Sequence, residues 1–253
     1  MIWAKDFYTM QRELLNSASV WSTFSPADPP AKLKLMADVV ERFAGRGSKG
    51  ILELGCGSGI VSAHLAYRGH KVTANDIVDV CVASARNYAE KVENGELSVV
   101  DGSFYEIELV DRFDVVCYFD GFGIGSDADQ RRLLHRIAGW LKPEGFALID
   151  VYFPGGFSQS SGEVYQEGNV MYREDFDADG CRLEESMWSV GEDESQAVTQ
   201  SLRCYSPADF RLLLEGTGLA MQIYEPYADP WKHDNPVNLK QAGIFLAKLV
   251  HEG

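Results

Sequence analysis

The sequence lacks any apolar run as long as the ~18 residues that a membrane-crossing helix needs. Its first fifteen residues, MIWAKDFYTMQRELL, mix acidic and basic side chains and lack the apolar stretch followed by small residues that marks a signal peptide. We therefore expect a cytoplasmic protein without a membrane partner. The length of 253 residues suits one large α/β domain with a smaller insertion.

Basic side chains are scarce. Lys and Arg total 23 against 38 Asp and Glu, which gives a net charge of −15. Proteins bind phosphate backbones and anionic lipid head groups mainly through Lys and Arg. Nucleic acid is therefore not an expected partner, although an acidic surface also simply keeps a cytosolic protein in solution.

Paired cysteines and metal-ligand spacings are also missing. The five cysteines are odd in number and form no C-x-x-C pair, and the five histidines form no H-E-x-x-H motif. We expect reduced thiols and no metal site. The cysteines are Cys56, Cys81, Cys117, Cys181 and Cys204.

Short apolar segments alternate with helical patterns between residues 48 and 153. Strands are predicted at 50–55, 70–76, 96–102, 112–120 and 146–153, and helices at 60–69, 80–92 and 128–145. This alternation favours a mostly parallel sheet wrapped by helices.

The pattern changes after residue 154. Three β-like segments joined by acidic, glycine-containing turns occupy 168–205 and predict an antiparallel meander. A helix is predicted at 206–218, with Ser206 as N-cap and Pro207 as its first residue, and two strands follow. The expected parts are an N-terminal helical cover (1–47), a core (48–153 and 206–253) and an antiparallel β insertion (154–205) that covers the substrate or contacts a second copy.

The segment ILELGCGSGI, residues 51–60, places three glycines directly after a predicted strand. A strand, glycine-rich turn and helix present backbone N–H groups at the carboxyl edge of a parallel sheet, where ligands bind. The dinucleotide fingerprint would need glycine where Ile60 stands, and no Lys follows as in a P-loop. This disfavours a dinucleotide oxidoreductase, and Glu53 beside the turn favours a cationic ligand over a polyphosphate.

Acidic residues end the next strands. Asp76 comes 21 residues after Gly55, where a carboxylate binds ribose hydroxyls in α/β nucleotide sites. Asp101 closes the third strand and Asp120 follows the fourth. Together these carboxylates suit an adenosine that carries a positive group, although each of them is also a common turn residue.

These motifs resemble those of class I S-adenosylmethionine-dependent methyltransferases. The resemblance covers about residues 48–153 and includes E-x-G-x-G-x-G at 53–59, Asp101-Gly102-Ser103 and WLKPEGFALID. It implies a Rossmann-like, seven-stranded, mostly parallel sheet with helices on both faces. The implied cofactor is S-adenosyl-L-methionine, which leaves as S-adenosyl-L-homocysteine.

The resemblance also implies roles for individual residues. Glu53 would lie near the methionine amino group, Asp76 would accept the ribose hydroxyls, and Asp101 would accept the adenine N–H. The full implied cofactor set is Glu53, Leu54, Gly55, Cys56, Gly57, Asp76, Ile77, Asp101, Gly102, Ser103, Tyr118 and Phe119.

Methyl transfer is an in-line displacement that relies mainly on positioning, so no catalytic triad is expected. A base is needed for a protonated amine or an alcohol. The catalytic candidates are Asp120, Tyr8 and His233, with Tyr118 and Tyr205 as further phenols, whereas His64 is expected to be structural.

The added parts carry aromatic residues and Met but no basic patch, which favours a small-molecule acceptor. We expect methylation at N or O, and less readily at C. A protein or RNA methyltransferase and a non-catalytic S-adenosylmethionine binder stay open, as do a monomer and a homodimer. The candidate cover residues are Trp3, Phe7, Tyr8, Trp21, Tyr165, Met171, Tyr172, Met187 and Trp188.

Overall fold

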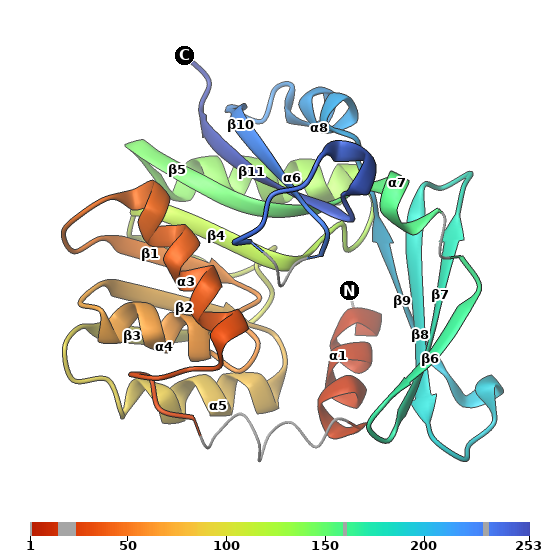
Figure 1. Ribbon diagram of the computed structural model, residues 1–253. Helices are drawn as coiled ribbons and strands as arrows, with labels where there is room; N and C mark the ends of the chain where they lie inside the picture. Colours follow the sequence, from red (N-terminus) through yellow and green to blue (C-terminus); the bar gives the residue numbers. More distant parts are fainter. Residues whose placement is uncertain (1, 15–23, 159–160, 230–232) are drawn as a thin grey trace.

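The computed structural model describes residues 2–14, 24–158, 161–229 and 233–253. Its main sheet has seven strands in the order β10-β11-β5-β4-β1-β2-β3 (Figure 1). They are β1 (Gly50–Leu54), β2 (Lys71–Asp76), β3 (Glu96–Asp101), β4 (Phe113–Phe122), β5 (Leu141–Tyr152), β10 (Leu219–Tyr227) and β11 (Ile244–His251). Only the pairs made by β11 are antiparallel. The predicted fold class is confirmed.

Two hydrophobic clusters cover the two faces of this sheet. One includes side chains of α3 (Ala31–Ala44), α4 (Ile60–Tyr67) and α5 (Asp79–Ala89). The other includes side chains of α6 (Asp127–Trp140) and α8 (Pro207–Leu214). Successive residues of β4 enter alternate clusters, because neighbouring side chains of a strand point to opposite faces. Burial on both faces explains why β4 reads as one continuous apolar run.

A second sheet stands beside the core (Figure 1). It is antiparallel, in the order β6-β7-β8-β9, and lies in the chain between β5 and α8. Its strands are β6 (Glu163–Glu167), β7 (Val170–Asp177), β8 (Arg182–Ser189) and β9 (Val198–Arg203). The short helix α7 (Pro154–Phe157) precedes it, and 3-10 turns occur at η1 (Glu194–Gln196) and η2 (Leu239–Gln241).

The sequence predicted three strands in this sheet, and β6 is a fourth. All five residues of β6 are exposed, so it has no apolar alternation by which it could have been found. It forms because the turn at Gly168, which has φ +59°, folds it back onto β7. There Tyr165 stacks on Tyr172 with ring centroids 5.1 Å apart.

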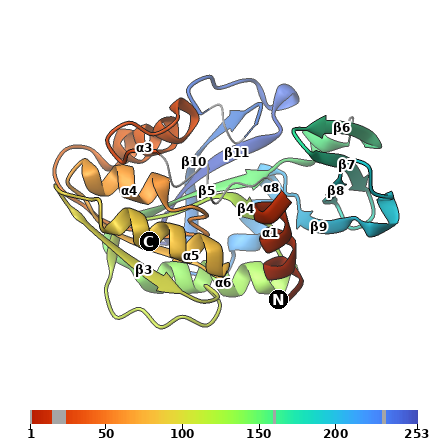
Figure 2. The ribbon, with the colours of Figure 1, turned by 90° about the horizontal axis from the view of Figure 1, so that it is seen from below.

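Helix α1 (Ile2–Leu14) lies between the two sheets (Figures 1 and 2). It packs Phe7 against Val170, Tyr172 and Met187 of the second sheet. Helix α1 thus lies within residues 1–47, where helical structure was predicted. Trp21 and the side chain of Trp3 lie outside the described residues.

The helix that follows the second sheet begins where the sequence predicted. Ser206 caps α8 in a capping box with Asp209, and Pro207 is the first helical residue, as predicted. None of the helices within the described ranges is both long and apolar enough to span a membrane.

Candidate active site

The third glycine of the turn after β1 serves helix packing. Gly59 is the N-cap of α4 and has φ +79°, a conformation that favours glycine. A Cβ at Gly59 would lie 2.5 Å from Cβ of Ala85 in α5. Since real Cβ atoms do not approach so closely, glycine is required for α4 to meet α5. This glycine therefore belongs to the scaffold and not to a ligand surface.

The first two glycines face side chains of other elements. A Cβ at Gly57 would lie 3.0 Å from Nη2 of Arg12, and one at Gly55 would lie 3.2 Å from Cε2 of Tyr118. The turn thus presents bare backbone between α1 and β4. The Tyr118 hydroxyl donates a hydrogen bond to the Gly121 carbonyl (2.6 Å), which fixes the ring beside Gly55.

Asp76 ends β2 next to the glycine turn. Its Oδ2 accepts a hydrogen bond from the Gly57 N–H, and its Oδ1 accepts one from the Val78 N–H, both at 2.8 Å. Burial raises the pKa of Asp76, and the two backbone N–H groups oppose that rise. A carboxylate has about four acceptor positions. Asp76 therefore retains acceptor capacity, for example for a hydroxyl of a ribose.

The loop after β3 lies beside Asp76. Asp101 pairs in register with Asp76, and the Gly102 N–H donates to the Asp76 carbonyl (2.9 Å). The Ser103 carbonyl accepts from the N–H groups of the next turn. Asp101 is exposed, whereas Ile77, Gly102 and Ser103 are partly buried. The structure therefore brings the predicted adenosine-binding residues to one edge of the sheet.

Glu53 and Cys56 are buried below the turn. Glu53 accepts a hydrogen bond from the Ser62 hydroxyl, and burial raises its pKa to about 7, with the charge of Asp76 adding to the rise. Leu54, next in β1, is fully buried. Burial raises the pKa of the Cys56 thiol well above its usual value, so Cys56 remains protonated. Its N–H donates to the Asn75 carbonyl (2.9 Å).

A bulge in β4 places Asp120. Tyr118 pairs with Ile149 and Phe122 pairs with Val151, so three residues of β4 stand opposite one residue of β5. Within the bulge Asp120 has φ +50°, an uncommon conformation for a residue other than glycine. The Tyr152 hydroxyl donates to Asp120 Oδ1. Burial raises the pKa of Asp120 to about 6, and the bond from Tyr152 opposes the rise.

Tyr8 of α1 connects this bulge to the second sheet. Its hydroxyl donates to Oε1 of Gln200 (2.9 Å), and Nε2 of Gln200 donates to Oε1 of Glu185 (3.2 Å). Burial raises the pKa of Tyr8, and the charges of Asp120 and Glu185 raise it further. Burial likewise raises the pKa of Glu185 to about 7, with Asp120 as the largest electrostatic contribution. Residues from α1, β4, β8 and β9 thus meet in one place.

His233, the third predicted base, has another partner. Its Nε2 lies 2.8 Å from Oδ1 of Asp150, and both side chains are fully enclosed. Burial lowers the pKa of His233, but the Asp150 carboxylate outweighs this effect and the net change is upward. The ring lies edge-on to Phe119, with centroids 5.9 Å apart. The charge of Asp120 thus acts on both Tyr8 and His233, and the structure places His233 in a buried pair with Asp150.

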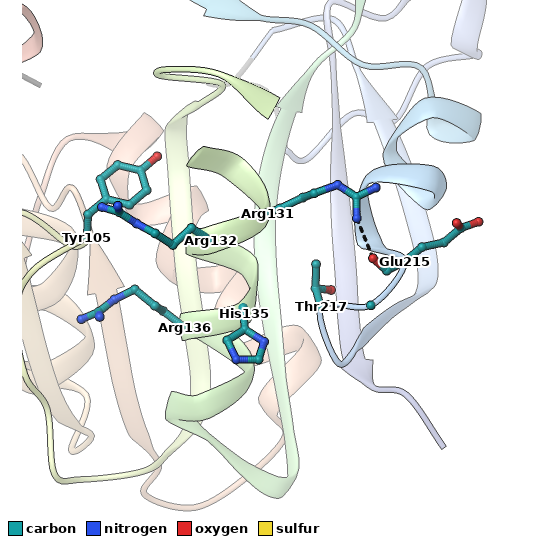
Figure 3. A pocket seen from close by; sticks show the side chains of 8 residues that line it. Tyr105, Arg131, Arg132, His135, Arg136, Glu215 and Thr217 are labelled. Carbon is teal, nitrogen blue, oxygen red and sulfur yellow. Dashed lines mark hydrogen bonds between the residues drawn. The ribbon is translucent and has the colours of Figure 1, made fainter. Parts of the chain in front are cut away.

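A cavity of about 480 Å³ lies elsewhere, between α6 and the loop after α8 (Figure 3). Arg131 donates there to the carbonyls of Glu215 (2.7 Å) and Leu212 (2.8 Å). Arg132 lies over the Tyr105 ring, and Arg136 donates to the Phe104 carbonyl (2.9 Å). These arginines hold loops in place, so the carboxylates around Asp76 and Asp120 define the candidate site.

Comparison with known proteins agrees with this geometry. Residues 51–145 match the family model of a methyltransferase domain. The structure of the CcbJ methyltransferase from Streptomyces caelestis superposes with a TM-score of 0.74 over 93% of this chain and 96% of that one, at 21% identity, which shows a shared fold. Residues 51–145 thus resemble a methyltransferase domain, and the chain shares the fold of a solved methyltransferase.

Two curated relatives each match less than half of the chain. The cypemycin N-terminal methyltransferase of a Streptomyces species is 32% identical over 116 residues, which are 45% of this chain and 46% of that protein. A ubiquinone biosynthesis O-methyltransferase of Rickettsia prowazekii is 33% identical over 100 residues, which are 39% of this chain and 38% of that protein. The chain thus spans less than half the length of these relatives.

Several residues around the candidate site were not predicted from the sequence. Arg12, Tyr152 and Gln200 have ordinary sequence surroundings and reach the site only through the fold. Glu185 did carry a signal. In RLEESM, residues 182–187, Glu185 is two residues from Leu183 and two from Met187, both of which are buried. Because alternate residues of a strand share a face, this spacing places a charged residue on an apolar face.

Proposed function

We propose that the chain transfers the methyl group of S-adenosylmethionine to a nitrogen or oxygen of a small-molecule acceptor. The observation that carries the proposal is the position of Asp76, bound to the bare turn at Gly57 on the same sheet edge as the Asp120 bulge. One carboxylate suits the cofactor's ribose, and the other suits an acceptor next to the reacting carbon.

The residues present fit this cofactor. Gly55 and Gly57 have no Cβ between their backbone and the side chains of Tyr118 and Arg12, and Asp76 would accept the ribose hydroxyls. Arg12 approaches Gly57 and its charge acts on Asp76, so its guanidinium would pair with the cofactor's carboxylate. Asp101, Gly102 and Ser103 would hold the adenine, with Ile77 against its face. Bound S-adenosylmethionine would supply a methyl group on a positively charged sulfur.

The protein's own contribution is to orient the acceptor, take its proton and exclude water. Asp120 is the proposed base, since a carboxyl with a pKa of about 6 is ionised at neutral pH and is still basic enough to take a proton. The Tyr152 hydroxyl orients it. The Tyr8 hydroxyl of α1, fixed by Gln200, would contact the acceptor. Tyr118 and Phe119 would flank the sulfur, with His233 supporting Phe119.

The relatives support both possible atoms, because one is named for an N-terminal amine and the other for an oxygen. A screen of small amines and alcohols with methyl-labelled S-adenosylmethionine tests the proposal. We expect label in at least one small acceptor. Label only in protein or RNA would indicate a macromolecular substrate. Cofactor binding without transfer to any acceptor would indicate a non-catalytic binder. For the oligomeric state, the prediction stays that the chain is a monomer or a homodimer.

A further inference from the structure

A row of polar side chains crosses the face of the second sheet that α1 covers. Strand register aligns Glu174 of β7, Glu185 of β8 and Gln200 of β9. The rows on either side are apolar. They are Phe176, Leu183 and Leu202 on one side, and Tyr172, Met187 and Val198 on the other. Polar groups in the middle of a packed apolar face are costly unless they have partners. Glu174 accepts a hydrogen bond from the Tyr165 hydroxyl (3.1 Å), and Glu185 accepts one from Gln200 (3.2 Å). A carboxylate has about four acceptor positions, so Glu185 can accept further hydrogen bonds.

Two carboxylates at this place are oriented by separate donors. Gln200, only 7% exposed, accepts from the Tyr8 hydroxyl and therefore turns its NH₂ group toward Glu185. Tyr152 orients Asp120 in the same way from β5. The amide and the two phenols belong to three different elements, since Gln200 lies in β9, Tyr8 in α1 and Tyr152 in β5.

The charges that act on Glu185 are those of Asp120 and Glu174, and both are acidic. Like charges in a partly buried site disfavour each other, whereas a cation between them would stabilise both. A hydroxyl would leave this repulsion in place. An ammonium group would offset it and would donate hydrogen bonds to both carboxylates.

We propose that Glu185, positioned by Gln200, determines acceptor specificity by binding an ammonium group, so that the acceptor is an amine that arrives protonated. This inference rests on the proposed function and selects nitrogen as the methylated atom. An N–H bond of the ammonium breaks, and its proton passes to the Asp120 carboxylate. The freed electron pair on nitrogen then forms the bond to the methyl carbon, while the electrons of the carbon–sulfur bond stay on sulfur.

The test compares Glu185→Gln with Glu184→Gln, the neighbouring residue on the opposite face of β8. Calorimetry measures binding of cyclohexylamine and of neutral cyclohexanol, with and without S-adenosylhomocysteine. We expect E185Q to bind the amine at least about tenfold more weakly than the wild type and E184Q to bind it equally well. Cyclohexanol and S-adenosylhomocysteine should bind all three proteins alike, and Glu185→Asp should restore part of the amine affinity.

Amine binding that is the same in E185Q and wild type, or a wild type that binds the alcohol as well as the amine, would overturn the inference. Melting temperatures and the unchanged S-adenosylhomocysteine affinity show that the variants are folded. If S-adenosylhomocysteine fails to bind the wild type, the proposed function fails. In that case the titrations without S-adenosylhomocysteine still measure how amine binding depends on Glu185.

Discussion

Asp120 is the residue in which local conformation and chemistry are most closely linked. A left-handed conformation outside glycine costs about 1–2 kcal/mol, although Asp and Asn tolerate it better than other residues. Asp120 adopts this conformation in the β4 bulge, at the sheet edge where the cofactor would bind. Such a strained position beside a ligand site supports a functional role for its side chain.

The role of Asp120 predicts a pH dependence. As a base it must be ionised, and its pKa is raised to about 6, so activity should fall as the pH drops below about 6. Asp120→Asn keeps a side chain that tolerates φ +50° and removes the base. We expect it to lower kcat by about 10²–10⁴-fold and to abolish the acidic limb of the pH profile. A variant with wild-type kcat would contradict the role of base.

At the residue scale, some positions were predictable from the sequence and others were not. Asp76 ends one strand that is evident in the sequence, and Asp120 lies near the carboxyl end of another, inside β4 and not after it as expected. Their place at one sheet edge follows from the parallel topology. Tyr152 also belongs to a predicted strand, but its bond to Asp120 depends on the bulge, which no residue in FDGFG specifies alone. Asp150, the partner of His233, was missed because a buried ion pair depends on a distant loop.

At the scale of elements, the regular alternation of strands and helices made the core predictable. The second sheet was less so, because β6 has no buried face and is defined only by its pairing with β7. Helix α1 could be recognised as a helix, but its place between the sheets comes from contacts of Phe7 with residues more than 160 positions away, such as Val170.

The packing of α4 on α5 can be tested at Gly59. Gly59→Ala adds a Cβ at 2.5 Å from Ala85, and it also puts alanine at φ +79°. Gly216→Ala is the matched control, with φ +75° and no atom within 4 Å of the added Cβ. We expect the control to lose about 1 kcal/mol of unfolding free energy and Gly59→Ala to lose about 2 kcal/mol more, measured by urea denaturation. Equal losses would show that the contact with α5 is not limiting.

At the scale of the whole molecule, the site joins residues that are far apart in the chain. Tyr8 and Arg12 come from α1, Asp120 from the core, and Glu185 and Gln200 from the second sheet. Sequence motifs located the cofactor half, because its residues lie on consecutive strands. The acceptor half depends on how α1, the core and the second sheet pack together, and no local sequence pattern encodes that packing.

Unfolding of the whole chain should report the charge state of Glu185. Its pKa is about 7 in the folded protein, against an ordinary value of 4.5. Between these values the folded state binds more protons than the unfolded state, so this group lowers stability as the pH rises. Gln does not titrate. The melting temperature of Glu185→Gln relative to wild type should therefore increase from about pH 4.5 to about pH 7 and then level off, whereas a difference that is constant with pH would refute the raised pKa.

The most direct test of the proposed function is a calorimetric titration with S-adenosylhomocysteine of wild type, Asp76→Ala and Asp79→Ala. Asp79 is a matched control because its exposed carboxylate pairs only with Lys5 among the interactions found in the described residues. We predict saturable binding to wild type and Asp79→Ala, and about 10–100-fold weaker binding to Asp76→Ala through lost charge-assisted hydrogen bonds. Unchanged affinity in Asp76→Ala, or a wild type that binds NAD but not S-adenosylhomocysteine, would contradict it.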